Sequence, residues 1–339
     1  MKKIRLIVWT VIVCLLAGTA FLYYIYTDRP FGGKSGQAYI YIDTDDDMDS
    51  VQVKLQQVGL SSTLPLKLFN AVSKYEKHIK PGAYAVDLST RVWEVLRMLR
   101  NGRQTPVRVV IPSIRTLDRM VATIDKRIMA DSADIMRVLN DTAYIGSLGF
   151  TRETLPALFI PNTYEFYWTV SPEAFVKQMH KEYTRFWTKE RLQKAEKKGL
   201  TAVEVSILAS IVEEETAYNP EKPTIAGLYL NRIKKGIPLQ ADPTVKFGLK
   251  AFELRRILNE HLKIDTPYNT YMHRGLPPGP IRIPSIVGIE SVLNATEHEY
   301  IYMCGKEDFS GSHNFAVTYA EHLRNAARYW KALNERGIK

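Results

Sequence analysis

The sequence predicts an α+β protein that carries one membrane-spanning helix at its N-terminus. Three observations lead to this prediction. The run Leu6–Tyr26 is apolar and uncharged, Ala38–Ile42 and Val107–Ile111 have the pattern of short strands, and most of the remaining chain has the apolar spacing of helices. The composition, 45% hydrophobic and 24% charged, is that of an ordinary globular chain with ample apolar material for a core.

The N-terminal run has the features of an uncleaved membrane anchor. It is long enough to cross a bilayer as a helix, basic residues precede it, and aromatic residues cluster at its far end. The basic flank predicts a cytoplasmic N-terminus, with the body outside the cytoplasmic (inner) membrane, in the periplasm where there is one. The alternative is a cleaved signal peptide, because Ala17–Ala20 are small residues. We favour the anchor, since the apolar run continues past these residues.

The remaining pattern predicts a linker at 28–37, a small module at 38–105 and a larger domain at 106–339, after an anchor at 1–27. Within the small module the pattern predicts helix, helix, turn, strand and helix. Its last helix has an apolar stripe that includes Val92, Val95 and Leu99, and Ser89 or Thr90 is expected to cap it. The other predicted helical segments of the larger domain are Leu117–Arg127, Ala133–Asn140, Ser171–Lys198, Thr224–Lys235 and Tyr319–Leu333.

Composition argues against several classes of site. The two cysteines, Cys14 in the predicted anchor and Cys304 in the body, should not meet, so no disulfide framework or cysteine metal site is expected. The seven histidines have no paired metal spacing, and we expect neither a metal nor another cofactor. A net charge of +10 suits an anionic membrane surface or wall polymer. No nucleic-acid motif accompanies this charge, so nucleic acid is not an expected partner.

The stretch Thr201–Lys246 contains the candidate chemistry. Thr201 and Glu204 fit a capping box at the start of a helix, and Asn219-Pro220 is a plausible stop. Three successive glutamates lie near the end of this helix. A second helix follows, with a small Ala-Gly pair that allows close approach to a neighbour, and Gly236 ends it. The Asp-Pro-Thr sequence at 242–244 is expected to form a turn.

Helical spacing distinguishes the three glutamates. Residues three and four apart share a face, so Glu215 lies over Ile211 and Val212 on the most apolar stripe. Glu213 and Glu214 lie over smaller or more polar positions. An apolar environment raises a carboxyl pKa because desolvation penalises the charged form, and a general acid near neutral pH requires such a shift. Glu215 is therefore the predicted acid; the alternative is an ordinary solvated acidic helix end.

Several stretches together resemble the YceG-like family of membrane-anchored endolytic murein transglycosylases. The resemblance extends from about Ile40 onward and rests on the order and combination of the motifs. A departure occurs at Pro161-Asn162-Thr163-Tyr164, where the family tends to have aspartate in place of Asn162. The matching stretches are LASIVEEET at Leu208–Thr216, LYLNRIKKGIPLQADPTVKFG at Leu228–Gly248, TPYNTYMHRGLPPGPI at Thr266–Ile281 and HNF at His313–Phe315.

The resemblance implies both an architecture and a reaction. The small module would be LysM-like, and the active-site helices of the larger domain lysozyme-like. The catalytic acid of the family is the glutamate before a threonine, which here is Glu215 followed by Thr216. The reaction would cleave the β-1,4 bond from N-acetylmuramic acid (MurNAc) to N-acetylglucosamine (GlcNAc) within nascent peptidoglycan strands and leave 1,6-anhydro ends. Implied partners are the glycan strands, the cytoplasmic membrane and peptidoglycan synthases.

Polar residues around these motifs are the remaining site candidates. They supply amides, hydroxyls and carboxylates suited to an amide-bearing sugar, although each also fits a structural turn or a hydrogen-bonded position. The predicted substrate-binding residues are Gln240, Asp242, Thr244, Tyr268, Asn269, Thr270, Tyr271 and His313, and the predicted supporting residues are Glu213, Asn231 and Arg232.

Two other functions compete with the transglycosylase. One is a peptidoglycan hydrolase that pairs Glu215 with Asp242, because ordinary glycosidases use two carboxyl groups. The other is a non-catalytic wall-binding anchor. A lytic transglycosylase needs one carboxyl group in the main role, since its nucleophile is the C6 hydroxyl of the substrate itself. Anhydro ends, reducing ends or no cleavage would separate the three.

Overall fold

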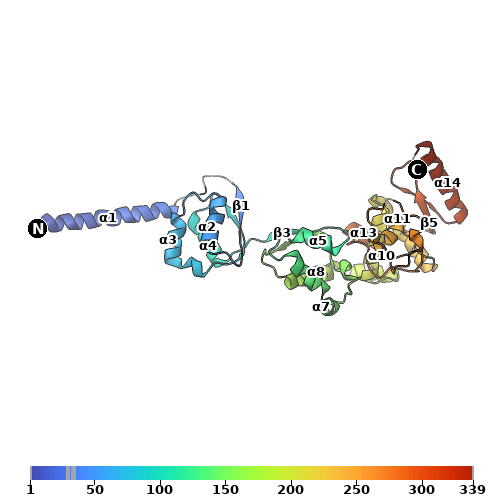
Figure 1. Cartoon of the computed structure of the whole chain (residues 1–339), viewed down its shortest axis with the longest axis horizontal. Helices are drawn as coiled ribbons and strands as arrows, with labels where there is room; N and C mark the ends of the chain where they lie inside the picture. The colour runs from blue at the N-terminus through green and yellow to red at the C-terminus, as the bar shows by residue number, and fades with distance from the viewer. Residues whose placement is uncertain (1, 28–30, 32–35, 255, 338–339) are drawn as a thin grey trace. The chain divides into compact units, whose positions relative to one another are not determined.

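The structure is a computed structural model that describes residues 2–27, 31, 36–254 and 256–337 (Figure 1). It is a mixed α and β structure, as the sequence predicted. The chain divides into two compact units, which are described separately. Unit 1 comprises Met1–Val109, Arg127–Met129 and Glu165–Val170, and unit 2 comprises Val110–Lys126, Ala130–Tyr164 and Ser171–Lys339. Most of the linker predicted at 28–37 lies outside the described residues.

Helix α1 (Lys2–Thr27) confirms the predicted apolar N-terminal helix. Within the described residues it is the one helix that is long and apolar enough to cross a membrane. Its apolar side chains are exposed, in contrast to those of a core helix. This helix fits a single-pass membrane anchor.

The remainder of unit 1 is a small sheet covered by helices. Strands β1 and β2 pair antiparallel, with Ile40 opposite Tyr84. Alternation along β1 buries Ile40 and Ile42 and exposes Tyr39 and Tyr41, which is the period-two pattern that the sequence predicted. The elements are β1 (Gln37–Ile42), α2 (Met48–Gln57), α3 (Leu64–Ser73), β2 (Gly82–Asp87) and α4 (Val92–Asn101).

The predicted cap of α4 is wrong. The residue at the N-cap is Arg91, whose side chain makes no capping hydrogen bond. Ser89 is unavailable because its backbone N–H and its hydroxyl both donate to Asp87, at 2.8 and 2.7 Å. This local turn at the end of β2 competes with capping. The predicted stripe of α4 is buried, and Gly102 ends the helix in a left-handed conformation.

The elements that follow belong mostly to unit 2. Strands β3 and β4 form one two-stranded sheet, and β5 and β6 form another, which is antiparallel. The stretch predicted as helical over Ser171–Lys198 is two helices, because Thr188 caps a new one. The elements are β3 (Val107–Ile111), α5 (Leu117–Ile124), α6 (Ser132–Asn140), α7 (Thr142–Ser147), β4 (Asn162–Phe166), α8 (Pro172–Phe186), α9 (Lys189–Lys197), α10 (Ala202–Glu215), α11 (Lys222–Lys234), α12 (Asp242–Gly248), α13 (Ile286–Leu293), β5 (Tyr302–Gly305), β6 (His313–Ala316) and α14 (Tyr319–Glu335).

Helix α10 runs through the core of unit 2 and packs against α11 and α13 (Figure 1). Every residue from Val205 to Val212 is buried. The predicted capping box is present: the Glu204 backbone N–H donates to the Thr201 hydroxyl at 3.2 Å, and Glu204 Oε2 accepts from the Thr201 N–H at 2.7 Å. Burial on all sides holds α10 as a rigid support for its last turn.

Helix α10 ends at Glu215 and not at the predicted Asn219-Pro220 stop. Thr216 has extended backbone, and its hydroxyl accepts a hydrogen bond from the Tyr218 N–H at 3.0 Å. A threonine hydroxyl that hydrogen-bonds a nearby backbone N–H in this way stabilises a turn and competes with continuation of the helix. Glu215 is thus the last helical residue, where the backbone turns away.

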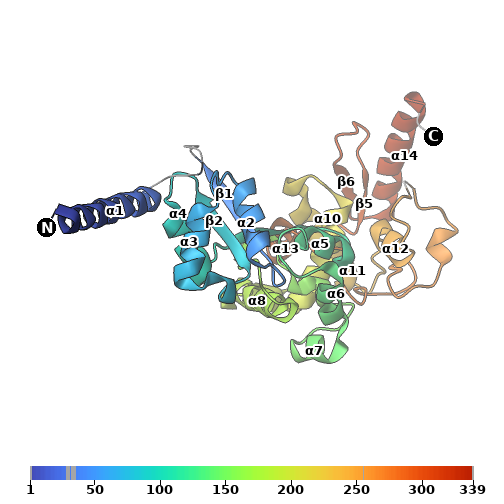
Figure 2. The same cartoon turned by 60° about the vertical axis from the view of Figure 1, so that its left-hand side comes forward.

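The Asp-Pro-Thr sequence also differs from its prediction, because it begins α12. Proline is tolerated in a first helical turn, where its missing N–H has no intrahelical partner to lose. Beyond α12, the β5–β6 hairpin packs beside α14 (Figure 2). A tilted ring contact between Tyr302 and Tyr319, with centroids 5.8 Å apart, is part of this packing.

Candidate active site

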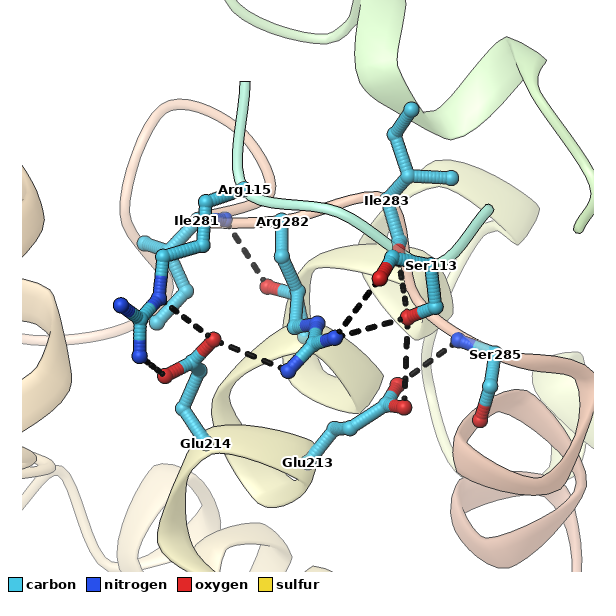
Figure 3. Close-up of polar contacts among 9 residues, drawn as sticks. Ser113, Arg115, Glu213, Glu214, Ile281, Arg282, Ile283 and Ser285 are labelled. Atoms are coloured by element: carbon cyan, nitrogen blue, oxygen red, sulfur yellow. Dashed lines mark hydrogen bonds and ion pairs between the residues drawn. The ribbon is translucent and has the colours of Figure 1, made fainter. Parts of the chain in front are cut away.

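The three glutamates at the end of α10 point in different directions. Successive helical residues are rotated by about 100°. Figure 3 shows Glu213 and Glu214 directed toward two other segments, 113–115 and 281–285. Glu213 Oε2 accepts a hydrogen bond from the Ser285 backbone N–H at 2.7 Å. Its other oxygen accepts a longer one from the Ser113 hydroxyl at 3.3 Å. The Glu213 side chain thus ties the last turn to the start of α13.

Glu214 is held by two arginines (Figure 3). Arg115 donates from Nε and Nη2 to its two carboxylate oxygens at 2.9 and 2.6 Å, a bidentate pair. Arg282 donates from Nη1 at 2.9 Å. The Glu214 side chain is 9% exposed, so this charge is compensated in a site with little solvent. Both Glu213 and Glu214 are therefore occupied in fixing the last turn of α10.

We expect Glu214→Gln to lower the free energy of unfolding by about 2 kcal/mol, because it leaves two partly buried guanidinium groups without a carboxylate. Glu335→Gln is the matched control. That side chain is 65% exposed and pairs with Lys331 at 3.9 Å, so its loss should change stability by about 0.5 kcal/mol or less. Chemical denaturation of the full chain in detergent measures both. Equal effects of the two changes would contradict the assigned role of Glu214.

Glu215 lies apart from this ion-pair network and faces a pocket. Its Oε1 accepts a hydrogen bond from the hydroxyl of Tyr229 on α11 at 2.8 Å. Tyr229 is 1% exposed and part of the core around α10. The apolar neighbours on α10 that the sequence pattern placed under Glu215 are buried in the same core.

Burial raises the pKa of Glu215 to about 7. The hydrogen bond from Tyr229 opposes this rise, since it favours the charged form. The nearby carboxylates of Asp242 and Glu214 add to the rise, and Lys246 lowers the pKa. A carboxyl group with this pKa is protonated in a substantial fraction of molecules near neutral pH, as a general acid must be.

Two substitutions should move this pKa in opposite directions. Tyr229→Phe removes a hydrogen bond to the carboxylate and should raise the pKa of Glu215, whereas Asp242→Asn removes a nearby negative charge and should lower it. Any activity that needs protonated Glu215 declines as pH rises through this pKa. The alkaline limb of kcat/KM should therefore shift upward in Tyr229→Phe and downward in Asp242→Asn. Shifts of the same sign would contradict the assignment of Glu215 as the acid.

The pocket has a volume of about 310 Å³ and is lined mainly by polar side chains. They come from the end of α10, from α11, from the start of α12 and the segment before it, from the loop that contains Tyr271, and from the β5–β6 hairpin and α14. Its lining residues are Glu215, Leu228, Tyr229, Arg232, Leu239, Gln240, Asp242, Tyr271, Tyr302, Met303, Cys304, Gly305, His313 and His322.

Two further acidic residues, Asp242 and Glu221, are hydrogen-bonded to residues of the pocket wall. The Tyr271 hydroxyl donates to Asp242 Oδ1 at 2.6 Å, and burial together with this contact raises the pKa of Tyr271. Glu221 is 8% exposed, and its carboxylate accepts from the His313 backbone N–H at 2.7 Å. His313 Nδ1 lies 2.9 Å from the same carboxylate. Glu221 thus fixes the position of a pocket histidine.

Arg232 and Gln240 form a second polar pair in the pocket. Arg232 Nη2 donates to Gln240 Oε1 at 2.5 Å, and its other donors bond the carbonyls of Pro238 and Ile301 at 2.8 and 2.7 Å. Arg232 is only 6% exposed. Gln240 has a φ of 56°, in the left-handed region that is unfavourable for most side chains.

The structure brings six of the predicted site residues to the pocket: Glu215, Arg232, Gln240, Asp242, Tyr271 and His313. Thr244 and Thr270 differ from their prediction because they are buried, with hydroxyl oxygens 2.9 Å apart. Asn269 also differs from its prediction. It is 1% exposed, and its amide donates to the carbonyls of Leu262 and Ile264. These three side chains fix the chain before and after the pocket residues and do not line it.

Tyr268 and Asn231 likewise lie outside the pocket lining. The Tyr268 ring packs against Phe247, with centroids 4.8 Å apart. Asn231 was expected to support Glu215, but its amide donates to the carbonyls of His298 and Tyr300 at 2.7 and 3.1 Å. It therefore supports the loop that follows α13.

Sequence reasoning missed Tyr229 and Glu221. The sequence pattern of an apolar helix does not show whether a tyrosine packs in the core or donates a hydrogen bond to the catalytic acid. Tyr229 does both. Glu221 comes shortly after the α10 turn, and only the fold places it beside His313. Among the described residues, no group of three or more histidine, cysteine, aspartate or glutamate side chains is arranged to hold a metal ion.

A comparison with protein families places this chain in a known class. The model of the YceG-like family matches residues 40–328. The chain therefore belongs to the YceG-like family. A crystal structure of a YceG-like protein from Listeria monocytogenes has a similar fold, with a TM-score of 0.56 and 24% identity. The match covers 86% of this chain and 99% of that one.

Two curated relatives are named endolytic murein transglycosylases. The one from Bacillus subtilis (strain 168) is 32% identical over 186 residues, which are 55% of this chain and 51% of the relative. The one from Streptococcus pneumoniae (strain D39) is 26% identical over 298 residues, which are 77% of this chain and 53% of the relative. The chain thus spans about half the length of the curated relatives that it matches.

Proposed function

We propose that this protein is a membrane-anchored lytic transglycosylase that cleaves peptidoglycan within its glycan strands. The observation that carries the proposal is Glu215, a carboxyl group with a pKa raised to about 7, on the wall of a polar pocket. The names of the relatives support the same reaction class. The α1 helix would anchor the body on the extracytoplasmic side. The module at 38–105 would be LysM-like, and the helices around Glu215 lysozyme-like.

The reaction needs one group that first gives and then takes a proton. Protonated Glu215 donates its proton to the oxygen that leaves C1 of MurNAc, and the glycosidic bond breaks. The C6 hydroxyl oxygen of the same sugar bonds to C1, and its proton passes to the Glu215 carboxylate. The products are a 1,6-anhydro-MurNAc end and a free GlcNAc 4-hydroxyl, with no water consumed. Attack within one sugar gains from the high effective concentration of the hydroxyl.

Tyr229 has a defined part in this cycle. Burial and the neighbouring Glu215 carboxylate raise its pKa, so its hydroxyl stays protonated at neutral pH. It can therefore donate to Glu215 whenever the carboxyl is charged, and this favours release of the proton to the substrate. The negative charge of Asp242 has the opposite influence on Glu215. Together, these opposing influences leave Glu215 able both to donate and to accept a proton near pH 7.

The test uses full-length protein in detergent with purified peptidoglycan sacculi, and mass spectrometry of the released fragments. Wild type should yield 1,6-anhydro ends and Glu215→Gln should not. Cleavage at internal positions, seen as a shift to shorter strands without early release of single disaccharides, would support endolytic action. A chain that cuts no glycan while still binding sacculi would instead support a wall-binding anchor.

One observation keeps the hydrolase as a second candidate. Asp242 lines the same pocket and is near enough to raise the pKa of Glu215, as a second carboxylate of a glycosidase would be. This candidate predicts reducing ends and incorporation of one ¹⁸O atom from labelled water into each new end. We favour the transglycosylase because Tyr271 donates to the Asp242 carboxylate, which weakens Asp242 as a base.

A further inference from the structure

We propose that Gln240 donates a hydrogen bond to the carbonyl oxygen of a substrate N-acetyl group, and that Arg232 is the positioning residue that aims it. This inference rests on the proposed function and deepens it, because it names the group that the pocket recognises.

Arg232 determines which end of the Gln240 amide faces the pocket. A guanidinium group has donors and no acceptor, so the atom 2.5 Å from Arg232 Nη2 must be the amide oxygen of Gln240. The Nε2 group, with its two donors, then points away from Arg232. Within the part of the chain that the structure describes, no side chain or carbonyl accepts from it, and Gln240 is exposed. The amide therefore offers donors to a ligand in the pocket.

Arg232 is itself rigidly held. Its three hydrogen-bonded nitrogens donate to Gln240 and to the carbonyls of Pro238 and Ile301, all neutral acceptors. No carboxylate pairs with it among the described residues, although it is 6% exposed. A nearly buried arginine that is aligned by main-chain carbonyls is a fixed support for the side chain to which it donates, Gln240.

The backbone at Gln240 has a conformation that glycine adopts at lower energy than any residue with a side chain. Its φ of 56° lies in the left-handed region, where a β-carbon is unfavourable. This conformation is fixed by the Gln240 N–H, which donates to the Thr270 carbonyl at 3.0 Å, and by the next N–H, which donates to the Thr270 hydroxyl at 3.0 Å. Strain of this kind at a pocket wall is typical of a functional side chain.

The charges near Gln240 favour a neutral acceptor over an anion. Arg232 is positive, but Asp242 lies two residues from Gln240 in the same pocket and Glu215 adds a second carboxyl group. A carboxylate ligand would meet both acids, whereas a carbonyl oxygen would meet only the amide donors. The acetamido groups of peptidoglycan sugars provide such an oxygen. Asn269, the other amide expected to bind them, is buried and hydrogen-bonded elsewhere.

The experiment measures anhydro-end formation by the full-length protein on soluble glycan strands, with and without enzymatic removal of their N-acetyl groups. Gln240→Glu keeps an acceptor for Arg232 but has no donor, so kcat/KM should fall about tenfold to a hundredfold, mostly through KM, on acetylated strands. On de-N-acetylated strands, which present an ammonium group in place of the acetamide, the variant should show no loss relative to wild type. A wild-type KM on acetylated strands would overturn the proposal, and so would an equal loss on both substrates.

A second set of variants tests the positioning role. Arg232→Lys should raise KM in the wild-type background but add less than about threefold in a Gln240→Gly background, because its target is gone. Additive losses would mean that Arg232 acts by itself and would overturn its assigned role. Gln240→Gly should change the melting temperature little, because relief of the left-handed strain offsets the loss of the hydrogen bond from Arg232.

Lys250→Gly is the matched control for backbone strain. Lys250 has a φ of 54° and does not line the pocket, so this change should leave KM unaltered. If Lys250→Gly raised KM as Gln240→Gly does, the effect would belong to the backbone and the proposal would be wrong. An active wild type with unaffected Gln240 variants refutes this inference alone. A wild type that forms no anhydro ends refutes the proposed function itself.

Discussion

Glu215→Gln is expected to reduce the rate of glycan cleavage by about 10³-fold or more. General acid–base catalysis by one group contributes roughly 10²–10⁴-fold, and Glu215 is assigned both the acid and the base role. Glutamine has nearly the same shape and still accepts a hydrogen bond from Tyr229, so the fold should persist. Release of anhydro-muramyl fragments from sacculi is the measurement. Full activity in Glu215→Gln would end the proposal that Glu215 is the catalytic acid.

Glu215→Gln should also change how the free energy of unfolding depends on pH. A carboxyl group titrates near 4.5 in the unfolded chain, whereas burial raises the pKa of Glu215 to about 7 in the folded one. Between these values the folded state binds more protons at Glu215, so the contribution of Glu215 to stability falls as pH rises from about 4.5 to 7 and is then constant. This loss is on the order of 3 kcal/mol at most. Glu215→Gln should lack it and be the more stable protein at pH 8.

Gly227→Ala is expected to lower the free energy of unfolding by about 2 kcal/mol or more. A β-carbon at position 227 would lie 2.3 Å from the carbonyl oxygen of Thr296 and 2.8 Å from His298 Nε2. The first of these is backbone and cannot rotate away, so α11 must shift. The same helix carries Tyr229 and Arg232, and we therefore expect a loss of activity that accompanies the loss of stability.

Gly146→Ala on α7 is the control for this prediction. Nothing lies within 4 Å of a β-carbon there, so the higher helix propensity of alanine should act alone and stabilise by roughly 0.5–1 kcal/mol. Denaturant titrations of both variants give the comparison. If Gly227→Ala matched Gly146→Ala in stability, the close packing of α11 on the segment around Thr296 would be refuted.

Local sequence signals predicted the elements well. The alternation at Ala38–Ile42 and the capping box at Thr201 both depend on neighbouring residues, and both are confirmed in the structure. The small Ala-Gly pair on α11 likewise lies at a close approach. Where a competing local bond decided the outcome, the prediction was wrong. Asp87 removed Ser89 as a cap, and the Thr216 turn ended α10 early.

The site was predictable only in part, for a physical reason. Helix periodicity separated Glu215 from its two neighbours, because the apolar stripe is encoded within one helix. Helix periodicity could not predict the ion-pair partners of Glu214. Arg115 and Arg282 come from segments far from α10 in the sequence, and only the packing of unit 2 brings them to one carboxylate. Asn269 shows the converse, since its motif suggested a sugar-binding amide and the fold buries that side chain.

The two ion pairs of Glu214 also determine when, during synthesis, the last turn of α10 acquires its final geometry. Synthesis proceeds from the N-terminus, so α10 exists before Arg282 and Ser285 have been added. Until the ribosome has passed these positions, the last turn of α10 lacks half of its ties, and the pocket around Glu215 lacks the wall that the β5–β6 hairpin and α14 supply. An incomplete chain should accordingly cleave no glycan strand. Catalytic activity should appear only near the end of translation.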